Sequence, residues 1–506
     1  MMGRGSGLKA ARRKQCPDAP DRDHRKFRHG AKGKNVKMKH WIITAALAGA
    51  PVLQLAADET SDTIKSLKAQ VEALDQKLKI LERKQELASE EAGAWLKDLP
   101  KISLGQDGFS FGSGDGNFSL RLRGVLQLDS RTFFSDGGIK GKDGFLIRRA
   151  RPIIQGTVWR DFDFLFVPDF GGTTPQIADA YLNYRIRPEF QLQAGKFKSP
   201  VGLESLQSDV EGQFNERGLP TSLVPSRDLG IQLHGEIFDG RFSYAAAILN
   251  GVGDARTSTN LDFDDDKEFA GRVFFQPFKK SSVSALDGLG FGLGGTYGKS
   301  FSASALPSTT GGTFPGYATD GQEQFFAYNP TGGAVVVANG EHWRLSPQGY
   351  YYHGPFGFLG EYVISDQRVS RTVAAPLISR RLENTAWQVS ASWVLTGEPA
   401  SYKGVVPDHP FDLSAGGWGA WQVVARFGQL EIDRAAFPLF SDPKSSAYSA
   451  QAWSVGLDWW LNKNVRVSTS FSHTEFGGGG GAGAGSPAAV TRQDENVFFT
   501  RMQLAF

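Results

Sequence analysis

The 506-residue chain is short of cysteine and of long apolar runs. Its single cysteine, Cys16, lies in a basic segment at the start of the sequence. Hydrophobic residues make up 40% of the chain and the mean hydropathy is −0.30. No stretch approaches the ~20 apolar residues that a membrane-spanning helix needs, which excludes a helical membrane protein. A chain without cysteine after its start is typical of proteins that assemble in an oxidising compartment such as the periplasm.

Side chains that carry out chemistry are also scarce. The five histidines after residue 57 are scattered among aromatics and turns, and none accompanies a serine in a nucleophile-elbow setting. The glycines of 288–295 lie in an alternating strand pattern without a following helix, unlike a phosphate-binding loop. The acidic run 262–266 fits a solvated loop better than a Ca²⁺ site. We therefore predict no enzyme, no cofactor and no metal site.

The first feature that is present is a strongly basic start. Residues 1–37 hold 12 Lys and Arg against 3 Asp. Residues 38–57 have the pattern of a secretory signal peptide, with a charged start, an apolar stretch and cleavage after Ala57. We predict that 1–37 are a spurious or unretained extension, because a basic arm has no use ahead of an export signal. Without 1–57 the net charge is −7 instead of +3, and no nucleic-acid partner is expected.

Residues 58–99 have an apolar residue at alternating spacings of three and four. This spacing predicts a periplasmic coiled coil of three heptads with Glu and Lys on its flanks. Three heptads are marginal alone, so we expect the coiled coil to join subunits that something larger holds together. The alternative is one amphipathic helix that packs on its own chain. The seam residues are Ile64, Leu67, Val71, Leu74, Leu78 and Leu81.

From residue 100 to residue 506 the pattern changes to period two. Leucines alternate with Arg, Gln and Asp in 120–129, and the last residues place Phe498, Met502 and Phe506 on one side of a strand. Repeated aromatic-rich segments of this kind are the signature of an all-β transmembrane antiparallel β-barrel, with apolar residues toward lipid and polar residues toward the lumen. A soluble β-protein is the alternative, and the signal peptide favours the barrel.

The length of the barrel region bounds its strand number. About 400 residues fit roughly 16 to 18 strands joined by short turns at one end and long loops at the other. Barrels of this size leave an aqueous channel rather than a packed core. The expected long loops are 251–267, 300–340 and 477–496.

Basic residues concentrate in 121–151, which holds 8 basic and 3 acidic residues. Arg121, Arg123 and Arg131 share the polar side of their strand. A charge on the lipid face costs about 2–4 kcal/mol near the midplane, so these arginines should face the lumen. Arginines on one wall would focus a positive potential and bind oxyanions. Alternatively, the arginines pair across strands with Asp129, Asp161, Asp163 and Asp179.

Several segments resemble one known family, the phosphate-selective porins of the O and P type. The segments are RRARPIIQGTVWRDFDFLFVPDFG (148–171), DAYLNY (179–184), FQLQAGKFKSPVGLE (190–204), FNERGLP (214–220), PSRDLGIQLHG (225–235), GAWQVVARF (419–427), WSVGLDWWLNKNVRV (453–467) and the closing DENVFFTRMQLAF. The resemblance covers roughly 100–506 and implies a trimeric barrel of 16 strands whose lumen is lined by basic residues. The final Phe506 looks like the signal that outer-membrane assembly machinery reads.

The resemblance also implies site residues. Arg123 matches a basic position of the first strand, Arg148 and Arg149 match paired arginines, and Arg217 and Asp179 match constriction positions. The full candidate anion-binding set is Arg121, Arg123, Arg148, Arg149, Arg151, Asp179, Lys196, Lys198, Arg217 and Arg227. Lys196 shares parity with Phe190, so a bulge or strand end is needed to turn it inward. The chain departs from the family by offering Asp209 and Glu211 where its phosphate-binding members carry lysine.

These observations predict a bacterial outer-membrane porin for passive diffusion of anions, most of all phosphate or polyphosphate. The expected partners are outer-membrane lipid, two further copies in a homotrimer, the barrel assembly machinery and inorganic anions. Because of Asp209 and Glu211, strict phosphate selectivity is not expected. The alternatives are a general or sugar-type porin, and a barrel that anchors a coiled-coil tether.

Overall fold

The computed structural model describes residues 56–134, 141–260, 262, 265–301, 316–329, 335–372, 378–480 and 491–506, with no side-chain description for 56–61, 91–98, 301 and 372. The predicted basic extension (1–37) and nearly all of the predicted signal peptide (38–57) lie outside these residues. The signal peptide therefore stays a prediction.

The first described element is a single long helix, α1 (Ala56–Asp98). It covers the segment in which the heptad spacing predicted a helix. All six seam residues are exposed, so the coiled coil itself stays a prediction. No helix in the described part of the chain is long and apolar enough to cross a membrane.

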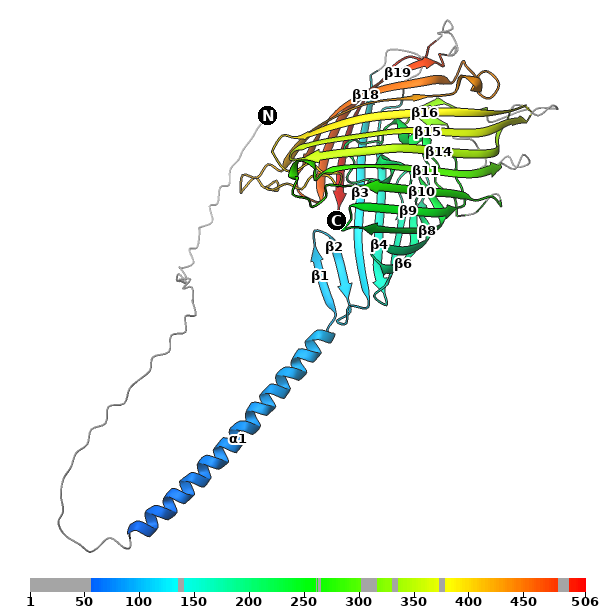
Figure 1. The fold of residues 1–506 in the computed structure, drawn as a ribbon. Coiled ribbons are helices and arrows are strands. Elements are labelled where there is room, and N and C mark those ends of the chain that lie inside the picture. The colour runs from blue at the N-terminus through cyan, green and yellow to red at the C-terminus, as the bar shows by residue number, and fades with distance from the viewer. Residues whose placement is uncertain are drawn as a thin grey trace, which may run out of the picture. The chain divides into compact units, whose positions relative to one another are not determined.

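The regular structure of the other described residues is mostly antiparallel sheet (Figure 1). A hairpin comes first, made of β1 (Lys101–Gly105) and β2 (Gly108–Gly112). The strands that follow up to residue 301 are β3 (Ser119–Phe133), β4 (Gly144–Val158), β5 (Phe162–Asp169), β6 (Gln176–Arg187), β7 (Phe190–Lys198), β8 (Arg227–Ile237), β9 (Phe242–Leu249), β10 (Glu268–Phe275) and β11 (Leu289–Phe301).

The second half of the chain supplies the remaining strands. They are the short pair β12 (Tyr317–Ala318) and β13 (Gln324–Phe326), then β14 (Val335–His353), β15 (Phe356–Thr372), β16 (Ile378–Val394), β17 (Ala420–Glu431), β18 (Ala447–Trp460), β19 (Val465–Gly478) and β20 (Glu495–Ala505). Short helical turns occupy the connections, namely α2 (Leu203–Leu206) and the 3-10 helices Leu219–Leu223, Ser284–Leu286 and Arg434–Ala436.

Sixteen strands, β3–β11 and β14–β20, form a closed ring. The ring closes where β20 pairs with β3, from Val497 opposite Phe133 to Ala505 opposite Val125. Phe506 completes this seam, because its amide donates to the Gly124 carbonyl at 3.0 Å and its carbonyl accepts from the Gly124 amide at 2.9 Å. The predicted 16-strand antiparallel barrel is confirmed.

The alternation of each strand sorts side chains between the two faces of the ring. On β20 the side chains of Phe498, Met502 and Leu504 are exposed, whereas Arg501 and Gln503 are buried against a segment inside the ring. The outer face is apolar and the inner face polar, as a lipid environment requires. Stacked aromatic pairs lie on the outer face near one end of the ring, including Phe356 on Trp393, where an interfacial aromatic belt is expected.

The two ends of the barrel differ in the connections between strands. At the turn end most connections are short, such as 159–161, 188–189 and 354–355, although two connections, 276–288 and 395–419, are longer. At the opposite, loop end the connections include 250–267, 302–334 and 479–494, close to the three predicted long loops. The sequence did not predict that the connection 395–419 is long, nor that residues 199–226 fold into the ring.

Residues 199–226, which join β7 to β8 and are called the lumen segment below, fold into the ring. Side chains of the inner wall hold its backbone from widely separated strands. Gln503 of β20 donates to the Val210 carbonyl at 3.0 Å, Arg466 of β19 to the Gly212 carbonyl at 2.7 Å, and Gln348 of β14 to the Val201 carbonyl at 2.7 Å. The lumen segment therefore crosses the channel and narrows it.

Candidate functional site

The site begins with two consecutive arginines on β4. Successive strand residues normally point to opposite faces, so only one of Arg148 and Arg149 should face the lumen. The pairing of β3 with β4 passes from Gln127 opposite Arg149 to Leu128 opposite Ile147, which leaves Arg148 as an extra residue. This β-bulge turns both side chains inward, and Arg151, which has the same parity as Arg149, joins them.

Asp209 of the lumen segment lies at the centre of an arginine cluster. Its Oδ1 is 3.2 Å from Nη2 of Arg149 and 2.6 Å from Nη2 of Arg217. Its Oδ2 forms an ion pair with Arg151 and is 3.8 Å from Nη2 of Arg227. We call Arg149, Arg151, Arg217 and Arg227 the arginine cage. Four arginines from β4, the lumen segment and β8 therefore converge on one carboxylate.

Further polar groups hold the arginine cage in place. Gln127 accepts from Nη1 of Arg149 at 2.7 Å and donates to the Asp209 carbonyl at 3.0 Å. Arg151 donates to Asp169 at 2.6 Å, and Arg227 forms a bidentate pair with Asp179 at 3.0 and 3.2 Å. Asp179 thus acts on the cage by orienting Arg227.

Glu216, also in the lumen segment, joins a second set of wall arginines. Its carboxylate accepts a bidentate pair from Arg148 at 2.7 and 3.0 Å. Nη2 of Arg131 is 3.3 Å from Oε1, and Nη2 of Arg501 is 3.4 Å from the same atom. Arg501 is also paired with Asp129 of β3 at 2.6 and 2.7 Å, so the predicted pairing across strands occurs there.

Asp209 and Glu216 are both strongly stabilised in their charged form. Burial would raise the pKa of Asp209, but the charges of Arg149 and Arg217 hold it well below its usual range. Burial likewise opposes ionisation of Glu216, but Arg148, Arg501 and Arg149 together outweigh it, so the pKa of Glu216 is also strongly lowered. The two carboxylates remain negative at any physiological pH.

A cavity of about 510 Å³ adjoins the arginine cage. Arg123, Lys403 and Glu211 line it together with Asp209, and Tyr402 of the 395–419 connection forms part of its wall. Among the described residues, Arg123 and the amine of Lys403 have no ion-pair partner within 4 Å. Five basic and three acidic residues face this space, so the cavity presents an excess of positive charge next to the cage.

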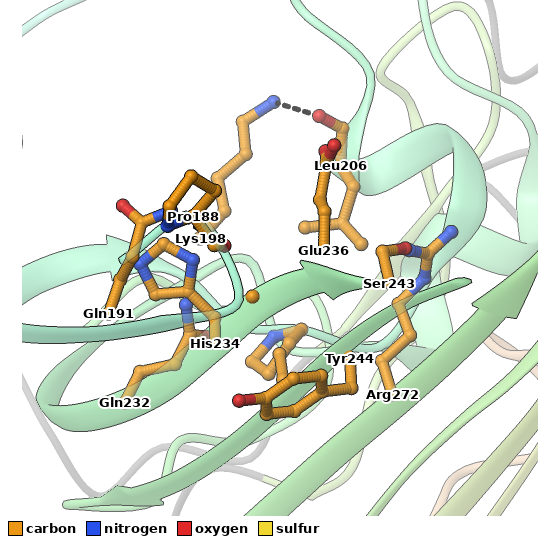
Figure 2. Close-up of a pocket in the computed structure, with 13 residues that line it drawn as sticks. Pro188, Gln191, Lys198, Leu206, Gln232, His234, Glu236, Ser243, Tyr244 and Arg272 are labelled. Carbon is orange, nitrogen blue, oxygen red and sulfur yellow. Dashed lines mark hydrogen bonds between the residues drawn. The ribbon is translucent and has the colours of Figure 1, made fainter. Parts of the chain in front are cut away.

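A second cavity, of about 390 Å³, is lined mainly by residues of β7, β8, β9 and β10 (Figure 2). Its lining includes His234, Glu236, Tyr244 and Arg272. Lys198 belongs to both cavities, and its amine donates to the Gln207 carbonyl at 2.6 Å and to the Leu206 carbonyl at 3.3 Å. Lys198 therefore lies where the two spaces meet.

The remaining predicted residues are placed elsewhere. Arg121 is exposed near the turn end of β3 and lines neither cavity. Lys196 also lines neither: β7 pairs with β6 in regular register from Leu192 to Lys196, so no bulge turns this side chain inward. Its amine instead donates to the Ser258 carbonyl at 2.6 Å.

Sequence reasoning missed several members of the site. Glu216 was not singled out, although it precedes Arg217 directly. Lys403 comes from a connection whose insertion no periodicity reveals. Arg426 of β17, which pairs with Asp320 at 2.7 Å and with Glu204 at 3.2 Å, could have been found from its polar parity alone. Among the described residues there is no cluster suited to a metal ion.

The closed ring with an apolar outer face and a polar inner face defines a transmembrane β-barrel of the porin class. The model of one family, phosphate-selective porin O and P, matches residues 120–506. The chain belongs to that family, and it is an outer-membrane channel for passive diffusion.

Solved porin structures resemble the chain at low identity. The outer-membrane channel DcaP of Acinetobacter baumannii is 11% identical, with 78% of this chain and 98% of that chain covered and a TM-score of 0.49. An anion-selective porin from Comamonas acidovorans is 11% identical, with 77% and 100% covered and a TM-score of 0.46. OmpT of Vibrio cholerae is 11% identical, with 77% and 98% covered and a TM-score of 0.45. Comparison with curated proteins gave no match.

Proposed function

We propose that the channel passes small anions, phosphate and polyphosphate among them, along the arginine-bearing part of its wall. The observation that carries the proposal is the convergence of Arg149, Arg151, Arg217 and Arg227 beside the 510 Å³ cavity. Guanidinium groups bind phosphate and carboxylate oxygens through paired, charge-assisted hydrogen bonds.

The distribution of charge supports a preference for anions. Residues 100–506 carry 36 basic and 40 acidic residues, a net charge of −4, yet the space beside the arginine cage has more cations than carboxylates. A local positive potential with low-dielectric walls raises the concentration of anions there, independent of the net charge of the protein.

The internal carboxylates limit how tightly an anion can bind. Asp209 and Glu216 already form ion pairs with wall arginines that an anion would contact. A channel must bind its ion well enough to recruit it and weakly enough to release it. We therefore propose anion preference with modest phosphate affinity, and not strict phosphate selectivity.

The test is conductance of the purified protein in planar bilayers. In a KCl gradient, the reversal potential should report anion preference, and added phosphate should reduce the chloride current in the micromolar to millimolar range. Cation preference together with indifference to phosphate would refute the proposal.

A general or sugar-type porin is the second candidate. The observation in its favour is aromatic: Tyr402 lines the 510 Å³ cavity and stacks on Tyr350 with ring centroids 5.2 Å apart. Aromatic faces favour sugar rings. Swelling of liposomes in neutral oligosaccharides at rates set only by solute size would support a general porin, and saturable uptake of one sugar a specific one.

We further propose that the protein works as a homotrimer in outer-membrane lipid, inserted by the barrel assembly machinery, which would read the strand ending in Phe506. In this arrangement α1 lies in the periplasm and pairs with its copies through the seam. A tether between barrel and periplasmic partners is the alternative role for α1. Deletion of 58–99 should weaken the trimer if the helix serves assembly, and leave trimer and conductance intact if it serves as a tether.

A further inference from the structure

The carboxylate of Asp209 has the position and the partners that a bound oxyanion would have. Its two oxygens face four guanidinium groups, two to each oxygen, at 2.6–3.8 Å for the three pairs at Arg149, Arg217 and Arg227 and in closer contact with Arg151. The side chain is only 7% exposed. Convergent arginines around two oxygens are the arrangement by which proteins recognise phosphate, sulfate and carboxylate ligands.

The arginine cage is not sealed from the channel. Asp209, Arg151 and Arg227 all line the 510 Å³ cavity, together with the unpaired Arg123. An oxyanion that enters the cavity therefore reaches two of the four guanidinium groups that hold Asp209, those of Arg151 and Arg227.

The internal carboxylate also leaves part of the cage unsatisfied. The Arg149 side chain is only 7% exposed, and its Nε is buried without a hydrogen-bond partner among the described residues. Oδ1 of Asp209 is close to two arginines, yet it forms no hydrogen bond of good geometry. A carboxylate on a short side chain thus fills the site incompletely, and a buried unpaired donor favours a ligand with more oxygens.

We infer that Asp209 is the residue that sets the anion specificity of this channel: it is an intramolecular substitute ligand that occupies a latent oxyanion site in the arginine cage. An external oxyanion must share or displace this carboxylate in order to bind. The inference rests on the proposed anion function and adds to it the residue that weakens phosphate binding.

The structure also indicates that Asp209 can be substituted without unfolding the lumen segment around the arginine cage. The backbone beside Asp209 is held by other side chains, since Gln127 donates to its carbonyl at 3.0 Å and Gln503 to that of Val210 at 3.0 Å. Asp209→Asn keeps the shape of the side chain and one acceptor oxygen but removes the charge. Glu211→Gln is the matched control, because Glu211 lines the same cavity and has no ion pair among the described residues.

The experiment titrates inorganic phosphate against the chloride current of single channels. Asp209→Asn should lower the phosphate concentration for half-maximal block by about tenfold and increase anion preference in a KCl gradient. Glu211→Gln should change both by less than about threefold, since it removes charge from the cavity but not from the cage. Equal effects of the two variants, or no effect of Asp209→Asn, would overturn the inference.

The outcomes separate this inference from the proposed function. A wild-type channel without anion preference, combined with strong phosphate block of Asp209→Asn, would refute the proposed function and keep the latent site. If the wild type prefers anions and Asp209→Asn changes neither this preference nor the phosphate block, the proposed function stands and the latent site is refuted. If Asp209→Asn does not fold, the double variant Asp209→Asn with Arg217→Gln restores the charge balance. Phosphate block no stronger than that of the wild type would then overturn the inference.

Discussion

At the scale of single residues, the two consecutive arginines of β4 show what a sequence pattern can and cannot provide. The family motif drew attention to Arg148 and Arg149, although the alternation of a strand allows only one of two consecutive residues to face the lumen. The bulge that turns in the second depends on the pairing of β4 with β3, which no local pattern records. The partnership of Arg149 with Asp209 was equally hidden, since it depends on a segment 60 residues away folding into the ring.

Arg149→Ala should reduce anion preference. The variant removes one of the four cations that face Asp209 and leaves the carboxylate of Asp209 in place, so the local potential becomes less positive. We expect the ratio of anion to cation permeability to fall by about two- to fivefold and the phosphate block to weaken, measured as reversal potentials in a KCl gradient.

The control for this prediction is Arg185→Ala. Arg185 pairs with Asp163 at 3.1 Å in a half-exposed position that lines neither cavity. An unchanged ion ratio in Arg149→Ala, or an equal change in both variants, would remove Arg149 from the site.

At the scale of elements, periodicity was a good guide wherever a segment met lipid or water along its length. Period two predicted the strands, and the three-four spacing predicted a helix that the structure places at Ala56–Asp98. Segments without periodicity were not predictable. The lumen segment and the 395–419 connection take their positions from contacts with distant strands, such as Tyr402, whose hydroxyl donates to the Leu203 carbonyl at 2.5 Å.

The seam of α1 offers a prediction at this scale. In the full protein, Leu74→Cys should form disulfide-linked dimers of the chain under mild oxidation, because facing seam residues in a coiled coil come within reach of one another. Gln76→Cys, on the opposite side of the helix, should not. The products can be separated on non-reducing gels. Dimers from neither position would favour the alternative, in which α1 packs on its own chain.

At the scale of the whole molecule, the buried ion pairs couple the stability of the barrel to pH. The lowered pKa values of Asp209 and Glu216 mean that these groups stabilise the folded state fully above their ordinary values of 3.8 and 4.5. This stabilisation is lost as the pH falls through the lowered values. Asp254, in the 250–267 connection, adds to the effect, since Arg344 and His342 together outweigh burial and lower its pKa to about 2.

The contribution of these three groups should therefore stay constant from about pH 8 to pH 5, and its loss should lower the unfolding temperature below about pH 4. Glu211 acts in the opposite sense, because burial raises its pKa. The double variant Asp209→Asn with Glu216→Gln should be less stable at pH 7 and lose less stability in acid. Unfolding can be followed by circular dichroism in detergent. If the unfolding temperature of the wild type and that of the variant depend on pH in the same way, Asp209 and Glu216 are not the groups that couple stability to pH.

The lumen segment has a mechanical consequence as well. It is tied to β3 and β20 through Gln127 and Gln503, and to β14 and β16 through Gln348 and Ser392. A segment that is bound to separated parts of the barrel wall resists compression of the barrel along the direction in which the segment runs. The cross-section of this barrel should accordingly change little under lateral pressure from the bilayer, and the width of the passage beside the segment should be set by the protein rather than by the surrounding lipid.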